Sequence, residues 1–171
     1  MTTTWPADKI ASLLSQAFLP PKRPETPTAA IDVLITFDAH GVSSHPNHIS
    51  LYHGARAFLK DLMRGRGAGR ACPVDLYTLT SVSAPRKYAS VADMPLTMAA
   101  AALRGIRGRA AGKEHPASLL FVNQIVGGGA LGAAWGAMVG AHKSQMVWFR
   151  WLWIVFSRYM VMNDLKLEQV R

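Results

Sequence analysis

The sequence has a single cysteine, Cys72, among its 171 residues. One cysteine cannot form an intramolecular disulfide, and it cannot build a cysteine-rich zinc site. This cysteine usage is typical of a reducing, cytosol-facing setting. The segment Met1–Lys9 also lacks the apolar core of a secretory signal peptide. A fold held together by intramolecular disulfides is therefore excluded.

Acidic residues are scarce, with 10 Asp and Glu against 19 Lys and Arg, which gives a formal net charge of +9. Such a balance favours polyanionic partners, which include nucleic acid, anionic lipid headgroups and phosphorylated substrates. Aromatic residues do not interleave with the basic clusters at 64–70 and 104–113, so we expect no nucleic-acid binding. Half of the residues are apolar, which predicts one packed domain over residues 1–171.

The middle of the chain predicts a βαβ unit. Ala29–Phe37 is a dense apolar run rich in β-branched residues, which indicates a strand buried within a parallel sheet. Ile49–Leu62 has the apolar spacing of a helix, and Val74–Val82 alternates as a second strand. Parallel sheets bind their ligands at the carboxyl ends of the strands. The polar loop Asp38–His48 directly follows the first strand, so we expect a site there.

Two histidines stand three residues apart in this loop. The proline that follows His45 disfavours helix at that histidine, whereas His48 falls in the first turn of the next helix, with Ser44 or Asn47 available as its cap. One imidazole could ligate a metal while the other donates a proton or stabilises an oxyanion. Asp38 could orient one of the rings as a hydrogen-bond partner.

The spacing of these histidines does not decide the function. His-x-x-His pairs are common, and on spacing alone ordinary polar loop histidines are the better interpretation. Zinc sites need three protein ligands or more. His40 and His53 are nearby in the sequence, but their spacing indicates nothing in particular.

Three longer blocks carry a family resemblance. They read LITFDAHGVSSHPNHISLYHGARAFL (Leu34–Leu59), LYTLTSVSAPRKYASVADMPLT (Leu76–Thr97) and AHKSQMVWFRWLWIVFSRYMVMNDL (Ala141–Leu165). In this order they resemble blocks of the eukaryotic N-acetylglucosaminyl-phosphatidylinositol de-N-acetylases, a branch of the wider LmbE-like family of zinc deacetylases. Together they cover 73 of the 171 residues.

The resemblance implies an α/β fold, a Rossmann-like three-layer α/β/α sandwich. It implies hydrolytic removal of the acetyl group from N-acetylglucosaminyl-phosphatidylinositol, an early step of GPI-anchor synthesis at the cytosolic face of the endoplasmic reticulum membrane. The implied partner is therefore a glycolipid substrate, and the implied cofactor is zinc or another divalent metal.

The family's residue roles carry over by resemblance to four positions. His48 matches a metal-ligand histidine, and His45 matches the histidine taken to polarise the oxyanion or protonate the leaving amine. Asp38 matches an acidic position of the same loop. His142 matches a position near the pocket.

One family motif has no counterpart. The remaining metal ligands and the base of the family lie in an Ala-His-Pro-Asp-Asp-Glu-type segment, and no His-Pro-Asp-Asp occurs in this sequence. The resemblance thus implies a domain truncated at its N-terminus. Because one protein ligand holds zinc poorly, we expect this chain alone to bind metal weakly and to lack efficient activity. A fragment of an active enzyme, a natural short form without catalysis and a chain that needs a partner all fit this expectation.

The last third of the chain has a rival interpretation. Ser118–Ala141 has no formal charge and carries glycines four residues apart, which is typical of a membrane-spanning helix, and Gln145–Met162 could be a second span. A two-span membrane protein is therefore one alternative function. A catalytically dead interaction module is another. The family resemblance instead predicts a strand at Leu119–Val122, a loop at Gly127–Gly129 and a helix at Ala133–Gln145.

Aromatic residues crowd the segment that follows. Trp148, Trp151 and Trp153 stand together with Arg150 and Arg158. Tryptophan and arginine suit a membrane–water interface, which predicts contact with a membrane surface through these tryptophans. Aromatics of an uncovered core are the equally weighted alternative.

Overall fold

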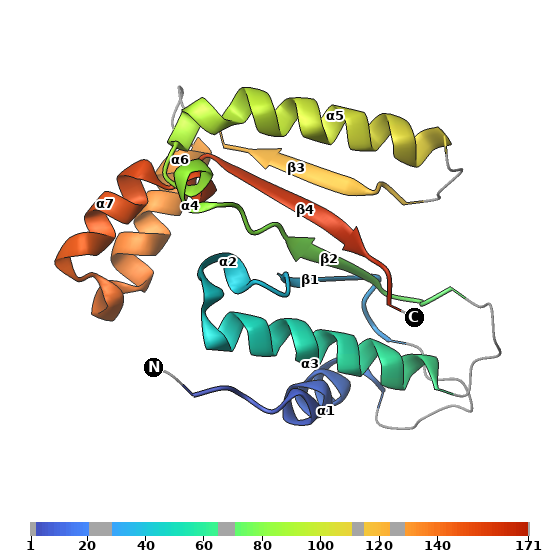
Figure 1. The fold of residues 1–171 in the computed structure, drawn as a ribbon. Coiled ribbons are helices and arrows are strands. Elements are labelled where there is room, and N and C mark those ends of the chain that lie inside the picture. Colours follow the sequence, from blue (N-terminus) through green and yellow to red (C-terminus); the bar gives the residue numbers. More distant parts are fainter. Residues whose placement is uncertain (1–2, 21–28, 65–70, 111–114, 124–128, 171) are drawn as a thin grey trace. The chain divides into compact units, whose positions relative to one another are not determined.

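The computed structural model describes residues 3–20, 29–64, 71–110, 115–123 and 129–170 and has an α/β fold (Figure 1). In these described segments, four strands form a sheet in the order β1-β2-β4-β3. The chain divides into two compact units, one of residues 1–81 with 166–171 and one of residues 82–165. The predicted fold class is confirmed.

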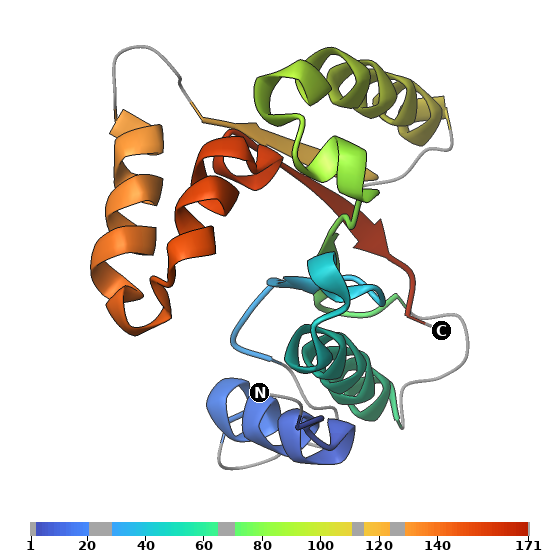
Figure 2. The same cartoon turned by 60° about the vertical axis from the view of Figure 1, so that its left-hand side comes forward.

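The first unit is built around the predicted βαβ unit. Its strands are parallel and in register, from the pair Val33 and Asp75 to the pair Phe37 and Leu79. Helix α3 connects them, and helix α1 lies along α3 in both views (Figures 1 and 2). The elements are α1 (Ala7–Phe18), β1 (Val33–Phe37), α2 (Gly41–Ser44), α3 (Pro46–Met63) and β2 (Asp75–Leu79).

Strand β1 differs from the prediction of a fully buried strand. Val33 and Ile35 are 46% and 57% exposed, whereas Leu34 and Thr36 are half-buried. Successive side chains of a strand point to opposite faces, and β1 lies at one end of the sheet order. The run of β-branched residues correctly indicated a strand. The expectation that both faces of this strand are covered was wrong.

The core of the first unit lies where α1, α3 and β2 meet. Phe58 and Leu59 of α3 are fully buried, and Leu76 of β2 packs in the same cluster. The apolar stripe predicted for this helix is therefore confirmed for its carboxyl-terminal half. Glu168, near the end of β4 (Met162–Glu168), accepts a hydrogen bond of 2.9 Å from the hydroxyl of Tyr52 in α3.

Gly54 sets the close approach of α1 to α3, and Gly54→Ala should destabilise the protein. A Cβ at this position would lie 2.4 Å from both Cβ and Cγ2 of Ile10 on α1. Overpacking of this kind typically costs about 1–3 kcal/mol of unfolding free energy. Urea denaturation measures the loss. The control Gly105→Ala on α5 meets nothing within 4 Å, and an equal loss there would refute the packing argument.

The second unit contains mainly helices. Helix α5 lies along β3 in both views, and α6 lies beside α7 (Figures 1 and 2). Its α-helices are α4 (Ala84–Lys87), α5 (Met94–Ala110), α6 (Gly129–Gly136) and α7 (Trp148–Phe156). It also holds strand β3 (Ser118–Val122) and residues 162–165 of β4. Short 3-10 turns cover Ser90–Asp93, Lys143–Gln145 and Arg158–Met160, and a π-helical turn covers Ala137–Ala141.

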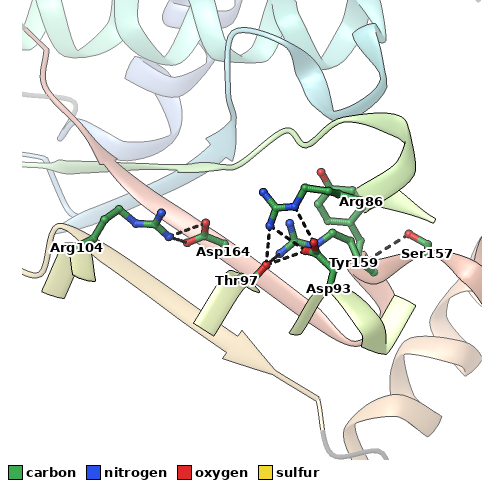
Figure 3. Close-up of polar contacts among 8 residues, drawn as sticks. Arg86, Asp93, Thr97, Arg104, Ser157, Tyr159 and Asp164 are labelled. Carbon is green, nitrogen blue, oxygen red and sulfur yellow. Dashed lines mark hydrogen bonds and ion pairs between the residues drawn. The ribbon is translucent and has the colours of Figure 1, made fainter. Parts of the chain in front are cut away.

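A buried polar cluster organises this unit (Figure 3). Asp93 accepts hydrogen bonds from Arg86 at 2.6 and 3.1 Å and from the Thr97 hydroxyl at 2.7 Å. The guanidinium of Arg158, which is 1% exposed, lies 3.2 Å from the same carboxylate and donates to Thr97 at 3.1 Å. Arg158 belongs to the turn after α7, so the cluster ties that turn to the start of α5.

Residues 118–123 and 129–145 follow the family-based prediction more closely than the membrane-hairpin one. The predicted strand is present as β3, and a helix with a π-helical end covers 129–141 in place of the predicted 133–145. The predicted glycine loop lies largely outside the described residues. Among the residues that the structure describes, no helix has the length and apolarity needed to span a bilayer.

Candidate active site

The site lies at the carboxyl ends of the two parallel strands of the first unit. The chain leaves β1 at Phe37 and enters the loop that begins with Asp38. It leaves β2 at Leu79, and Ser81 follows two residues later. This is the edge of a parallel sheet at which ligands bind.

Asp38 and Ser81 join the two strand ends. The Asp38 carboxylate accepts from the Ser81 backbone N–H and from its hydroxyl, both at 2.6 Å. It also accepts from the backbone N–H groups of His40 and Gly41, at 3.0 and 3.1 Å. The prediction gave Asp38 the task of orienting an imidazole. The structure shows its carboxylate bonded to backbone and serine instead, because the loop turns so tightly that its N–H groups point at this side chain.

The loop has an unusual backbone. Gly41, Val42 and Ser44 have φ angles of 60°, 63° and 55°. Positive φ is natural for glycine, and a Cβ on Gly41 would come within 2.9 Å of Ile49. A positive φ is strained for Val42, whose ψ of −44° places this residue near the rare γ-turn conformation. Ser81 supports the strained residue, since its hydroxyl accepts a 2.8 Å hydrogen bond from the Val42 N–H.

His48 stands in the first turn of α3, as predicted, and its ring is fixed from two sides. It stacks on Phe37 with the ring centroids 3.8 Å apart and an interplanar angle of 8°. Its Nδ1 lies 3.1 Å from the carbonyl oxygen of Gly41. Because a carbonyl only accepts, Nδ1 carries the proton and Nε2 keeps its lone pair. Burial lowers the pKa of His48, which favours the neutral ring that can ligate a metal.

His45 has the opposite hydrogen-bonding pattern. It is the N-cap residue of α3, and its Nδ1 accepts from the backbone N–H of Asn47 at 3.3 Å. In the neutral ring Nε2 therefore carries the proton and can donate it. The ring centroids of His45 and His48 are 4.8 Å apart. The predicted cap, Ser44 or Asn47, was wrong, because the imidazole itself accepts the free N–H of the helix.

The other predicted residues lie apart from this pair or in a different unit. His40 is exposed in the loop, and His53 is exposed on α3, edge-on to Tyr52. His142 belongs to the second unit, where it is exposed after the π-helical turn. Sequence reasoning missed Ser81, although its position just after the second parallel strand was a usable signal.

The donors do not make up a complete metal site. Among the described residues, no group of three or more His, Cys, Asp or Glu side chains is placed to hold a metal ion. His48 offers one free nitrogen, whereas zinc sites in proteins use three or four ligands. The described part of this chain therefore does not by itself fit the zinc ion that the resemblance implies.

Known proteins with a similar sequence share one name. The chain is 48% identical over 99% of its length to N-acetylglucosaminyl-phosphatidylinositol de-N-acetylase of Arthroderma benhamiae. It is 31% identical over 94% of its length to the protein of the same name from Bos taurus. The chain belongs to this de-N-acetylase family. It spans 57% of the Arthroderma protein and 51% of the bovine one, about half the length of these relatives.

Other comparisons give no further match. No protein-family model and no solved structure matches the chain. The family assignment therefore rests on the curated relatives, which include a Saccharomyces cerevisiae de-N-acetylase at 27% identity over 96% of the chain.

Proposed function

We propose that this chain carries part of the active site of an enzyme that hydrolyses the acetamide of N-acetylglucosaminyl-phosphatidylinositol. The reaction gives glucosaminyl-phosphatidylinositol and acetate at the cytosolic face of the endoplasmic reticulum membrane. The observation that supports the proposal most is the opposite hydrogen bonding of two histidines at a strand-end edge. Nδ1 of His45 accepts from a backbone N–H, whereas Nδ1 of His48 faces a backbone carbonyl. The names of the relatives supply the substrate.

His45 and His48 have different tasks in this proposal. Amide hydrolysis places negative charge on the carbonyl oxygen in the transition state, and a preorganised N–H donor stabilises that charge. His45 presents such a donor at Nε2. His48 presents a lone pair at Nε2 and is one ligand of a zinc or other divalent ion. By the family resemblance, the remaining ligands belong to an Ala-His-Pro-Asp-Asp-Glu-type segment, which has no counterpart in these 171 residues.

Asp38 and His142 have less direct support. Asp38 holds the loop through four hydrogen bonds, so we assign it to the architecture of the site and not to proton transfer. The structure describes His142 only within the second unit. Its place near the substrate remains a prediction from the family.

A chimeric protein tests the proposed function. In it, this chain replaces the matching 57% of the Arthroderma de-N-acetylase, so that the remaining ligands are supplied in their natural connection. We expect the chimera to release acetate from N-acetylglucosaminyl-phosphatidylinositol and this chain alone to release none. A chimera that folds, binds zinc and releases no acetate would contradict the proposal and favour the interaction-module alternative.

A membrane-contacting surface forms a second part of the proposal. Helix α7 exposes six large apolar side chains, one of which, Trp148, is 79% exposed. Trp153 is only half-buried and, with Tyr88 and Arg150, lines a shallow groove of about 390 Å³. We therefore propose that α7 enters the interfacial layer of the bilayer, where tryptophan is favoured. The exposed residues are Trp148, Phe149, Trp151, Leu152, Val155 and Phe156.

Replacing Trp148 and Leu152 with serine should weaken membrane binding. Each apolar side chain withdrawn from a bilayer forfeits about 1.5–3 kcal/mol, so the partition coefficient should fall by at least about tenfold. Co-sedimentation with vesicles that contain phosphatidylinositol measures it. The control replaces Leu96 and Leu103 on α5, which are 57% and 58% exposed. Equal losses in both variants would refute a specific role for α7.

A further inference from the structure

One peptide group of the loop connects Ser81 to His48. The N–H of the peptide between Gly41 and Val42 donates to the Ser81 hydroxyl at 2.8 Å. The carbonyl of the same peptide accepts from Nδ1 of His48 at 3.1 Å. This peptide is trans, and in a planar trans peptide the N–H and C=O point in opposite directions. The serine therefore determines where the carbonyl points.

We infer that Ser81 is a positioning residue that selects the tautomer of His48. With the carbonyl of Gly41 facing the ring, Nδ1 must be the donor, and Nε2 is left as a free lone pair. If this peptide turned over, its N–H would face the ring, Nδ1 would become the acceptor and Nε2 would carry the proton. A protonated Nε2 cannot ligate a metal.

The strain at Val42 drives that reversal when Ser81 is absent. Val42 has φ of 63°, which is unfavourable for a β-branched residue by about 1–3 kcal/mol. Turning the peptide over changes the φ of Val42 to a negative value and relieves the strain. The hydrogen bond from the Val42 N–H to Ser81 opposes this relaxation. Asp38 fixes the serine in turn, by accepting from both its hydroxyl and its backbone N–H.

His45 provides an internal reference. Its Nδ1 accepts from the Asn47 N–H at the start of α3, and that bond involves neither Ser81 nor the strained peptide. Loss of the serine hydroxyl should therefore change the tautomer of one histidine and leave that of its neighbour, 4.8 Å away between ring centroids, unchanged. A general loosening of the loop would change both.

The test is a nitrogen NMR spectrum of the histidine rings in this chain, labelled with ¹⁵N-histidine and free of metal. The spectrum is recorded at about pH 8, above the ordinary imidazole pKa. We expect the Nδ1–H tautomer for His48 in the unmodified chain and the loss of most of its signal in Ser81→Ala, with His45 unchanged. Retention of the Nδ1–H form in Ser81→Ala overturns the inference, and so does an equal change in both rings.

Two further variants test whether the effect is specific to the Ser81 hydroxyl and whether it depends on the strain at Val42. Ser83→Ala removes a nearby hydroxyl that caps no helix, and it should leave both rings as they are. Adding Val42→Gly to Ser81→Ala removes the strain, because glycine accepts positive φ. The His48 Nδ1–H signal should then return in part. Its complete absence from the double variant would overturn the role given to the strain.

The importance of this tautomer for catalysis rests on the proposed function. In an active chimera, Ser81→Ala should lower kcat by about 10–100-fold with KM retained, the usual effect of losing a residue that orients a metal ligand. An unchanged kcat would overturn the catalytic part of the inference. An inactive parent chimera would instead refute the proposed function and leave the spectral result standing.

Discussion

Replacing Asp93 with alanine should lower the free energy of unfolding by about 3–5 kcal/mol, the usual cost of removing one partner from a buried ion pair. Asp93 is 4% exposed, and it is the carboxylate on which Arg86 and Arg158 converge. Its removal takes away the carboxylate that pairs with the buried guanidinium of Arg158. Urea denaturation of the two proteins measures the difference.

The control for this prediction is an ion pair at the surface. Asp61 lies 3.3 Å from Arg64, and the two side chains are 50% and 83% exposed. Asp61→Ala should change stability by less than about 1 kcal/mol. A second variant, Asp93→Ala with Arg158→Met, should lose less than Asp93→Ala alone, because it also removes the unpaired charge. Equal losses for Asp61 and Asp93 would contradict the account of the cluster.

The same carboxylate gives the stability a dependence on pH. Burial by itself raises the pKa of Asp93, but hydrogen bonds from Arg86 and Thr97 and the charge of Arg158 hold that pKa below its ordinary value. The carboxylate therefore stabilises the folded protein fully above its unfolded pKa of about 3.9, and this contribution is lost as the pH falls further through the folded pKa. Unfolding free energies at pH 6 and pH 3, compared between the unmodified protein and Asp93→Asn, isolate this contribution.

The two histidines of the loop should respond differently when each is changed to alanine in the chimera. His48→Ala removes the metal ligand of the proposed function, so bound zinc and acetate release should both be lost. His45→Ala removes the N–H donor and the cap of α3 but no metal ligand, so zinc should remain while kcat falls by about 10²–10³-fold, the usual effect of deleting one oxyanion donor. Metal analysis and single-substrate kinetics separate the two.

His53→Ala is the matched control for both variants. His53 is exposed on the same helix, and its ring contacts Tyr52 rather than the loop pair. We expect its zinc content and kcat to equal those of the parent chimera. If His45→Ala lost zinc as completely as His48→Ala, the division of tasks proposed from the tautomers would be wrong.

The sequence predicted the framework of the site because that framework depends on local patterns. The apolar run that ends at Phe37, the helical spacing after His48 and the alternation before Ser81 each produced the expected element. Proline after His45 placed that histidine correctly outside the helix, since residues before proline avoid helical backbone.

The details of the loop could not be predicted in the same way. The role of Ser81 depends on a residue 39 positions away, Val42, whose positive φ no propensity scale predicts. Asp38 satisfies backbone N–H groups that exist only once the chain has turned. The exposure of Ile35 likewise depends on which strand lies at the end of the sheet. The composition of a strand does not predict the order of the strands in the sheet.

The most direct test of the central claim is the tautomer of each loop histidine in the unmodified, metal-free chain. The claim is that the backbone around this loop sets two neighbouring imidazoles for different tasks before any metal or substrate binds. The account predicts a proton on Nδ1 of His48 and on Nε2 of His45 in the same ¹⁵N spectrum. The same tautomer in both rings, or an even mixture in each, would contradict it.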